Sequence, residues 1–209
     1  GNLLLPCYDA AGELHSLQHI AGNGAKWYVT GGRVSGCFFI IADGGYPANV
    51  AILANAATNA LVISEGFATG ATIHEATGLP VAVARNAGNL RHVAKALRAK
   101  HPHAHILVAA DNDHATPGNP GMARATEAAQ AVGGTVVVPP FPELVDGQTD
   151  FNDLMAAHGA DLVRQTCAHA LSAPASPTTP VAPKATASGQ AWPALDPIPE
   201  PEGLPPAVF

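Results

Sequence analysis

The chain has 209 residues, with 10 Lys and Arg against 16 Asp and Glu and 12% charged residues, about half of the roughly 25% that is usual in globular proteins. This acidic balance argues against a general nucleic-acid coat or a membrane-surface binder, so a polyanion would need a local binding site. Hydrophobic residues (47%) can fill a core, and no apolar run approaches the ~18–20 residues of a membrane span, which predicts a cytoplasmic protein without a membrane partner.

Residues 1–57 predict a small, mainly antiparallel β subdomain. Short apolar or alternating runs are separated by turn residues at 9–12 and 22–24. We expect strands at 3–5, 13–20, 26–29 and 37–41 and a helix at 47–57.

Residues 58–172 predict an α/β domain, because apolar strands alternate with helices along this part of the chain. We expect strands at 61–63, 81–84, 106–110 and 135–138, helices at 69–76, 90–100 and 120–132, a loop at 86–89, and two short helices after the last strand. This alternation indicates a Rossmann-like parallel sheet with helices on both faces. Ligands bind such sheets beyond the carboxyl ends of the strands.

Residues 173–209 predict a disordered linker. They contain 10 of the 19 prolines, among Ala, Ser and Thr. Such a composition buries too little apolar surface to offset the entropy of ordering. The chain also begins with Gly1 and ends without a closing element, so we expect a piece of a longer protein in which this linker leads to a further domain.

The three cysteines, Cys7, Cys37 and Cys167, are widely spaced and form no CxxC pair. This pattern favours buried thiols over a disulfide framework or a closed zinc site.

Carboxylates follow three of the predicted strands, where parallel strands would bring them to one edge of the sheet. They are Glu65 after the strand at 61–63, Asp111 and Asp113 after 106–110, and Asp150 and Asp153 after 135–138 and a loop. Unpaired carboxylates repel one another, and hard divalent cations such as Mg²⁺ or Mn²⁺ relieve that repulsion. Two such ions can assist an in-line displacement at phosphorus.

The alternative is that these acids only cap the helices that follow them, because Asp is a preferred N-cap residue. One aspartate alone favours that interpretation. Three acidic strand ends together favour a metal site, and Glu65 is a poorer cap that precedes the turn-forming Gly66.

The ordered motifs resemble the toprim domain shared by bacterial DnaG-type primases, topoisomerases and some nucleases. The resemblance rests on Glu-Gly-Phe-Ala-Thr at 65–69, Asp-Asn-Asp at 111–113 and Asp-Phe-Asn-Asp-Leu at 150–154. It is strongest for the primase branch found in phages, plasmids and integrated elements. The runs at 9–12, 24–28 and 31–33 are similar to the small subdomain that precedes toprim in these primases.

The resemblance implies roles for the acidic residues. Glu65 would be the catalytic acid or base, and Asp111, Asp113 and Asp150 would be metal ligands. Together with the acidic strand ends, this gives an expected ligand set for two Mg²⁺ or Mn²⁺ ions of Glu65, Asp111, Asp113, Asp150 and Asp153. DnaG-type enzymes often carry an aspartate where Thr69 stands, so that additional ligand is missing here.

Half of the Lys and Arg residues lie between Glu75 and Asp111, where no acid occurs: Arg85, Arg91, Lys95, Arg98 and Lys100. Three of them, at 91, 95 and 98, share one face of the predicted helix. This face predicts template or triphosphate binding, the alternative being a solvated helix surface. Asn86, at a strand end, and His114, beside the acids, are further candidates for nucleotide or DNA contacts.

A second basic region lies at 14–42, which contains Lys26 and Arg33 and no acid. By resemblance these two residues would hold the template and the incoming nucleotide. Trp27 or Tyr28 is a candidate for base stacking. Phe38 and Phe39 are expected in the core.

These features together predict the catalytic core of a DNA primase that makes RNA primers on single-stranded DNA for replication of a mobile element. Its partners would be the DNA template, ribonucleoside triphosphates, and a replicative helicase or a fused helicase-like ATPase domain. Two alternatives remain, a toprim nuclease that uses the same metals and a non-catalytic nucleotide- or DNA-binding module of a replication protein.

Overall fold

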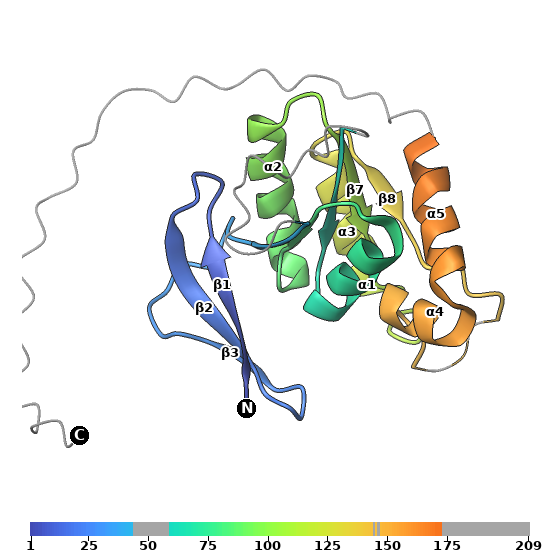
Figure 1. The fold of residues 1–209 in the computed structure, drawn as a ribbon, viewed down its shortest axis with the longest axis horizontal. Helices are drawn as coiled ribbons and strands as arrows, with labels where there is room; N and C mark the ends of the chain where they lie inside the picture. Colours follow the sequence, from blue (N-terminus) through green and yellow to red (C-terminus); the bar gives the residue numbers. More distant parts are fainter. Residues whose placement is uncertain (44–58, 144, 146, 173–209) are drawn as a thin grey trace, which may run out of the picture. The chain divides into compact units, whose positions relative to one another are not determined.

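The computed structural model describes residues 1–43, 59–143, 145 and 147–172 and arranges them around two β-sheets (Figure 1). The described residues belong to one compact unit. The helix expected at 47–57 and the linker expected at 173–209 lie outside the described residues.

The first sheet is antiparallel and has the order β1-β2-β3. Its strands are β1 (Leu3–Tyr8), β2 (Leu14–Ile20) and β3 (Lys26–Tyr28). Leu5 and Cys7 on β1 are buried, whereas Leu3 and Leu4 are exposed at the open end of the strand. The predicted small β subdomain is therefore confirmed for these three strands.

The second sheet has the order β4-β6-β5-β7-β8. Its strands are β4 (Phe39–Ile41), β5 (Ala60–Ser64), β6 (Val81–Val83), β7 (His105–Ala109) and β8 (Thr135–Val137). β5, β6, β7 and β8 are parallel to one another, as predicted. β4 was expected in the first sheet, but it pairs antiparallel with β6. A short apolar run fits either sheet, and an antiparallel edge strand is common on an otherwise parallel sheet.

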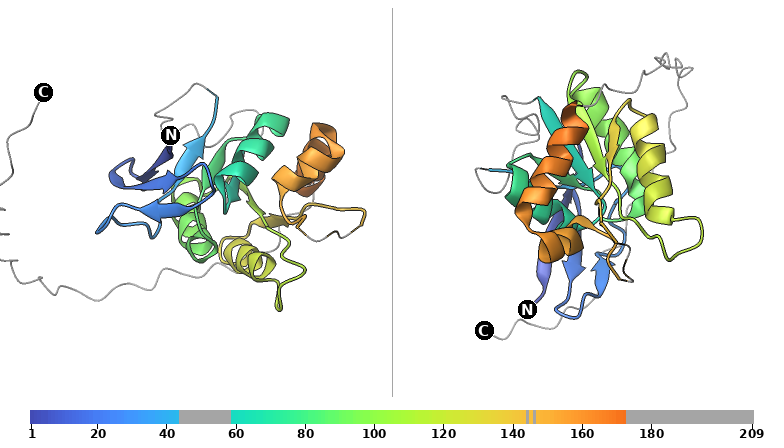
Figure 2. Two further views of the ribbon diagram at one scale, coloured as in Figure 1. Left: turned by 90° about the horizontal axis from the view of Figure 1, so that it is seen from below. Right: turned by 90° about the vertical axis from the view of Figure 1, so that its right-hand side faces the viewer.

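Helices cover both faces of the second sheet (Figure 2). α2 (Leu90–Lys100) and α3 (Pro120–Gln130) cover one face, while α1 (Phe67–Thr77), α4 (Phe151–His158) and α5 (Ala160–Ser172) cover the other. The segment expected as a loop at 86–89 contains a short 3-10 helix, η2 (Ala87–Asn89). The last helix is longer than expected. The predicted α/β fold class is confirmed.

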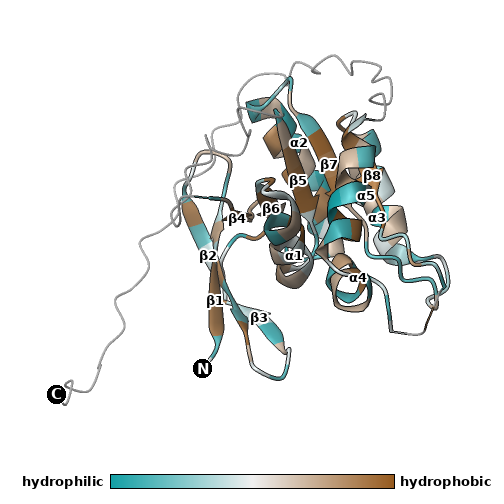
Figure 3. Cartoon of the chain, turned by 45° about the vertical axis from the view of Figure 1, so that its right-hand side comes forward, coloured by the Kyte–Doolittle hydropathy of each residue, from teal (hydrophilic) through white to brown (hydrophobic). Residues whose placement is uncertain are grey.

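β5 shows why this sheet needs two helical layers. All five of its residues are buried: Leu61 and Ile63 pack with α2 and α3, while Ala60 and Val62 pack with α1 and α5. The hydrophobic colouring of the central strands in Figure 3 shows the same pattern. A strand buried on both faces becomes a continuous apolar run, which is the pattern found at 60–63.

The three cysteines are buried free thiols, as predicted. Among the described helices there is none with the length and apolar character needed to span a bilayer.

Candidate active site at the carboxyl edge of the sheet

The loops that follow the parallel strands meet at one edge of the second sheet. Glu65 directly follows β5, and its carbonyl oxygen accepts a hydrogen bond from the backbone N–H of Arg85 at 2.7 Å. On the other side of β5, β7 leads to Asp111, and the N–H of Asn112 donates to the carbonyl of Thr149 at 2.7 Å. Elements far apart in the sequence therefore come together at this edge.

Asp111 combines an unpartnered oxygen atom with a raised pKa. Its Oδ1 atom is buried and has no hydrogen-bond partner among the residues that the structure describes. Burial, together with the charges of Glu65, Asp150 and Asp113, raises the pKa of Asp111 to about 7. A cation bound at this position would lower the free-energy cost of ionising Asp111.

Glu65 lies partly buried beside Asp111. Burial is the main cause that raises the pKa of Glu65, and the charge of Asp113 adds to it. A backbone hydrogen bond from Ala87 and the ammonium group of Lys26 act in the opposite direction. Glu65 therefore holds a proton more readily than an ordinary glutamate does, which suits a group that takes part in proton transfer.

Asp113 is fixed at the start of α3. Its Oδ2 atom accepts the backbone N–H of Gly121 at 3.1 Å. A Cβ atom at Gly121 would lie 2.4 Å from the carbonyl oxygen of Asp111, so only glycine permits this approach of the helix to the loop. The Asn119 side chain also bonds that of Asn112, which holds the acidic loop in place.

Asp150 and Asp153 form a capping box at the start of α4. Asp150 Oδ1 accepts the N–H of Asp153, while Asp153 Oδ2 accepts the N–H groups of Thr149 and Asp150. The alternative that these acids cap a helix therefore describes both residues. Asp150 nevertheless contributes to the raised pKa of Asp111, whereas Asp153 as a metal ligand gains no support from these contacts.

Thr69 has a role that the sequence did not reveal. It is 1% exposed, and its Oγ1 donates to Asp150 Oδ2 at 2.9 Å. The threonine at the position where the resemblance expects an additional acid thus orients one of the acidic side chains.

We define the acidic edge as Glu65, Asp111, Asp113 and Asp150. Its oxygen donors, close charges and unpartnered buried Asp111 Oδ1 fit a hard divalent cation. Within the described residues, no three His, Cys, Asp or Glu side chains are close enough to hold an ion as they stand. A bound cation would therefore have to draw these carboxylates closer together.

The basic and aromatic candidates between residues 14 and 42 lie in different surroundings. Lys26 on β3 is exposed, and its charge reaches both Glu65 and Asp111. Arg33 pairs with Asp9 at 2.7 Å while its side chain stays 51% exposed. Tyr28 bonds Gln18, whereas Trp27 stacks on a histidine of β2 and remains 43% exposed. Phe38 is fully buried, as predicted.

Arg85 does not lie where a nucleic acid could reach it. It is 5% exposed, has a positive φ of 74°, and donates to the Cys7 sulfur. Its location at the contact between the two sheets indicates a structural role, and the prediction of nucleotide or DNA contact lacks support. The sequence could not show this because a cation after a strand is usually solvated.

The three basic residues predicted on one face of α2 divide into two kinds. Arg98 is bound to four backbone carbonyls, of His101, Pro102, Ala104 and Val132, which tie down the end of the helix. Arg91 pairs with Glu127 of α3 at 2.9 Å, and Lys95 is exposed.

Two further candidates take part in local backbone contacts. The Asn86 side chain is exposed but caps η2 by accepting the N–H of Asn89. A ring nitrogen of His114 lies 3.1 Å from the carbonyl oxygen of Asn112, beside the acidic loop.

Asn89 is the main residue that sequence reasoning missed. It is 4% exposed; its amide nitrogen donates to the carbonyls of Val34, Cys37 and Ala84, and its oxygen accepts the N–H of Gly36. It therefore joins the segment before β4 to the loop beside Glu65. An asparagine in a polar loop gives no sign of such a buried position.

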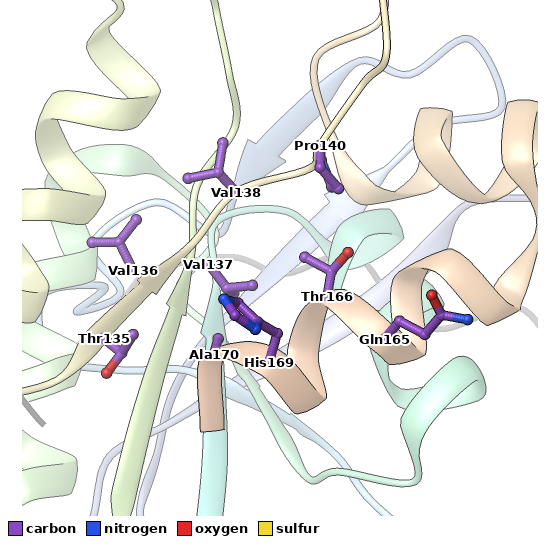
Figure 4. Close-up of a pocket in the computed structure, with 9 residues that line it drawn as sticks. All are labelled: Thr135, Val136, Val137, Val138, Pro140, Gln165, Thr166, His169 and Ala170. Carbon is purple, nitrogen blue, oxygen red and sulfur yellow. The ribbon is translucent and has the colours of Figure 1, made fainter. Parts of the chain in front are cut away.

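A cavity of about 480 Å³ lies away from the acidic edge, between β8 and α5 (Figure 4). Val136, Val138 and Ala170 form much of its wall, with Thr166 and His169 beside them. The nine described residues that line it include no carboxylate and no Lys or Arg. It therefore offers little for metal or phosphate chemistry.

Comparison with known proteins agrees with this geometry. Residues 60–161 match the family described as Toprim domain. A DNA primase TraC from Escherichia coli is 43% identical over 141 residues, which cover 66% of this chain and 12% of that protein. The chain thus spans about a tenth of the length of the curated relatives that it matches.

Two solved structures share the fold. The primase fragment of the bacteriophage T7 primase-helicase protein superposes with a TM-score of 0.55 at 16% identity, covering 78% of this chain and 62% of that one. The RNA polymerase domain of Mycobacterium tuberculosis primase DnaG gives 0.55 at 18% identity, covering 81% and 56%.

Proposed function

This chain belongs to the toprim family through residues 60–161 and resembles the DnaG-like primases, and we propose that it is the catalytic core of a DNA primase. It would join ribonucleotides on a single-stranded DNA template. The similarity to a DNA primase over 141 residues supports this choice within the toprim family. The bacteriophage origin of one structural relative agrees with use in a mobile element.

The proposal is carried by the pairing of Glu65 with Asp111. The two residues follow neighbouring parallel strands at one edge of the sheet, and burial is the main cause that raises the pKa of each. The charge of Asp113 adds to the shift of Glu65, and the charges of Glu65, Asp150 and Asp113 add to that of Asp111. Glu65 is suited to take up the proton of an attacking 3′-hydroxyl, because burial makes its carboxylate more basic.

The acidic edge would hold Mg²⁺ or Mn²⁺, which lowers the barrier to phosphoryl transfer by neutralising developing negative charge. We expect two ions, with Glu65, Asp111, Asp113 and Asp150 as ligands and Asp153 as a weaker candidate. Thr69 and Asn119 would keep the ligand-bearing segments in position.

The partners proposed for the whole protein are single-stranded DNA, ribonucleoside triphosphates and a helicase. Lys26 has the best location for a contact with the nucleotide, because its charge already acts on Glu65 and Asp111. Arg33 can reach a ligand once its ion pair with Asp9 opens. The helicase is proposed because the T7 relative is a primase-helicase protein.

Incubation of the chain with single-stranded DNA, Mg²⁺ or Mn²⁺ and labelled ribonucleotides tests the proposal. We expect new oligoribonucleotides that disappear when the divalent cation is chelated. Glu65→Gln should reduce synthesis by about 1,000-fold, since general acid–base groups contribute roughly 10²–10⁴.

Glu75→Gln is the matched control, because Glu75 is exposed on α1 and makes the same charge change away from the edge. It should stay within about twofold of the unaltered chain. Shortened DNA would identify a nuclease instead. The absence of both products, also in the full-length protein, would favour a binding module.

A further inference from the structure

A polar pocket of about 260 Å³ lies between α2 and α3, outside the acidic edge. Four basic side chains line it, together with one carboxylate and the backbone of η2. Its main residues are Ala87, Arg91, His92, Lys95, Arg124 and Glu127. We call this set the basic pocket.

The charges in the basic pocket do not balance. Glu127 is held between Arg91 at 2.9 Å and Arg124 at 3.0 Å, so its single negative charge is shared by two guanidinium groups. Lys95 adds a third full positive charge, and Glu127 is the one acid among the described residues that line the pocket. Arg91 and Arg124 remain about half exposed, which leaves their other N–H groups accessible from solvent. The pocket therefore has an excess of two positive charges on partly exposed side chains.

The basic pocket is next to the proposed catalytic residue. Ala87 lines it, and the backbone of the same residue hydrogen-bonds the Glu65 carboxylate. The neighbouring N–H of Arg85 bonds the Glu65 carbonyl at 2.7 Å. On the other wall, α3 begins at the residues that hold Asp113. A ligand in this pocket would be separated from the acidic edge by little more than η2.

We propose that the basic pocket binds the phosphate backbone of a single-stranded DNA chain as it passes the acidic edge. This proposal rests on the proposed function, because it concerns the nucleic acid on which that site acts. Phosphate oxygens are the natural partners of Arg and Lys groups, and binding them releases counterions.

A strand fits this pocket better than a free nucleotide. The basic groups are spread over two helices, and the described residues of the lining include no Phe, Tyr or Trp and a single imidazole, that of His92. A site that reads only phosphate suits a chain of any sequence. The four basic side chains can contact successive phosphates without base recognition.

The test compares two charge-matched double variants of the chain. Lys95→Gln with Arg124→Gln removes two cations from the basic pocket. Lys100→Gln with Arg164→Gln removes two from elsewhere, since Lys100 bonds the Ala10 carbonyl at the far end of α2 and Arg164 lies on α5. Binding of fluorescent oligo(dT) is followed by anisotropy over a range of salt, in EDTA so that no divalent cation bridges DNA to the carboxylates.

We expect the pocket variant to bind at least about tenfold more weakly and its salt slope to fall by about 1.4, since each phosphate contact on a single strand contributes roughly 0.7. The control variant should stay within about twofold. Equal losses in the two variants, or no measurable binding by the unaltered chain, would overturn the proposal. Thermal unfolding confirms that both variants are folded.

A second measurement, of nucleotide binding, distinguishes the phosphates of a DNA strand from those of a free nucleotide. Binding of a fluorescent ribonucleoside triphosphate should be the same in the pocket variant and the unaltered chain. Loss of nucleotide binding with normal DNA binding would overturn the assignment to a strand. Because these measurements need no catalysis, a pocket-dependent DNA affinity would stand even if no primer were made, so this result and the proposed activity fail separately.

Discussion

The acidic edge and the basic pocket are neighbours that carry unbalanced charge of opposite sign. At the acidic edge four carboxylates are crowded, and the buried Oδ1 of Asp111 has no partner within the described part of the chain. In the basic pocket three full positive charges face one acid, and the side chains remain partly exposed. The acidic edge needs cations and the basic pocket needs anions. This difference is expected if the acidic edge holds the catalytic metal ions and the basic pocket binds the DNA strand.

The difference also shows why the net charge of −6 is misleading. Exposed cations around one carboxylate can attract a polyanion locally whatever the total charge, because interactions beyond about 10 Å are screened at ~0.1 M salt. The partly buried carboxylates of the acidic edge need direct neutralisation, since burial removes part of their hydration.

Neutralising Asp111 is the strongest test of whether the acidic edge and the basic pocket have separate functions. Asp111→Asn should lower the turnover of primer synthesis by about 1,000-fold, in the range of an essential electrostatic group, while the DNA affinity changes by less than about twofold. Turnover and DNA concentration dependence are measured together. Asp161→Asn, at an exposed position of α5, is the control and should change neither. A large loss of DNA affinity in Asp111→Asn would show that the two regions are not separate in function.

The loop between the two regions depends on Asn89. Asn89→Ala leaves a buried backbone N–H and three carbonyls without their partner, which should lower the free energy of unfolding by about 2–4 kcal/mol. Urea denaturation measures the change. Asn86→Ala, which removes only the exposed cap of η2, should cost about 1 kcal/mol. Equal costs would mean that Asn89 does not fix the loop between Glu65 and the basic pocket.

Much of the fold could be predicted because it depends on local pattern. The strand at 60–64 is a continuous apolar run, and the helix at 90–100 begins and ends where its apolar spacing begins and ends. The sheet assignment of β4 could not be predicted, because three apolar residues carry no information about which edge they join. Pairing of distant segments is decided by packing.

The site was predictable to the extent that strand order brings sequence motifs together. Parallel strands make it certain that Glu65 and Asp111 share an edge, and a sequence can show this. It cannot show that Arg85 turns inward, that Arg98 binds carbonyls, or that Arg124 joins the basic pocket from another helix. Such roles depend on side-chain direction and on contacts between helices.

The acidic edge should also make stability depend on pH. The folded pKa of Asp111, about 7, lies above its ordinary value of 3.8, so between these pH values the folded chain binds more protons than the unfolded chain. Stability should therefore fall as pH rises from about 4 to about 7, by roughly 1–3 kcal/mol. Thermal unfolding in EDTA measures this fall. Asp111→Asn should flatten it, and Mg²⁺ should restore stability at high pH; an unchanged slope in the variant would contradict the assignment.

The smallest expected effect comes from neutralising Glu127, which should strengthen DNA binding at the basic pocket. Glu127 is held ionised chiefly by the hydrogen bond from Arg124, with Arg91 contributing, and it occupies donors that a phosphate could use. Glu127→Gln should therefore tighten oligo(dT) binding by about two- to fourfold at low salt, because the excess positive charge rises by one. Exposed ion pairs add little to stability, so unfolding should hardly change. Glu75→Gln makes the same charge change on the other face of the sheet and should have a smaller effect on binding. Weaker binding by Glu127→Gln would mean that this carboxylate positions the two arginines for the strand instead of competing with it.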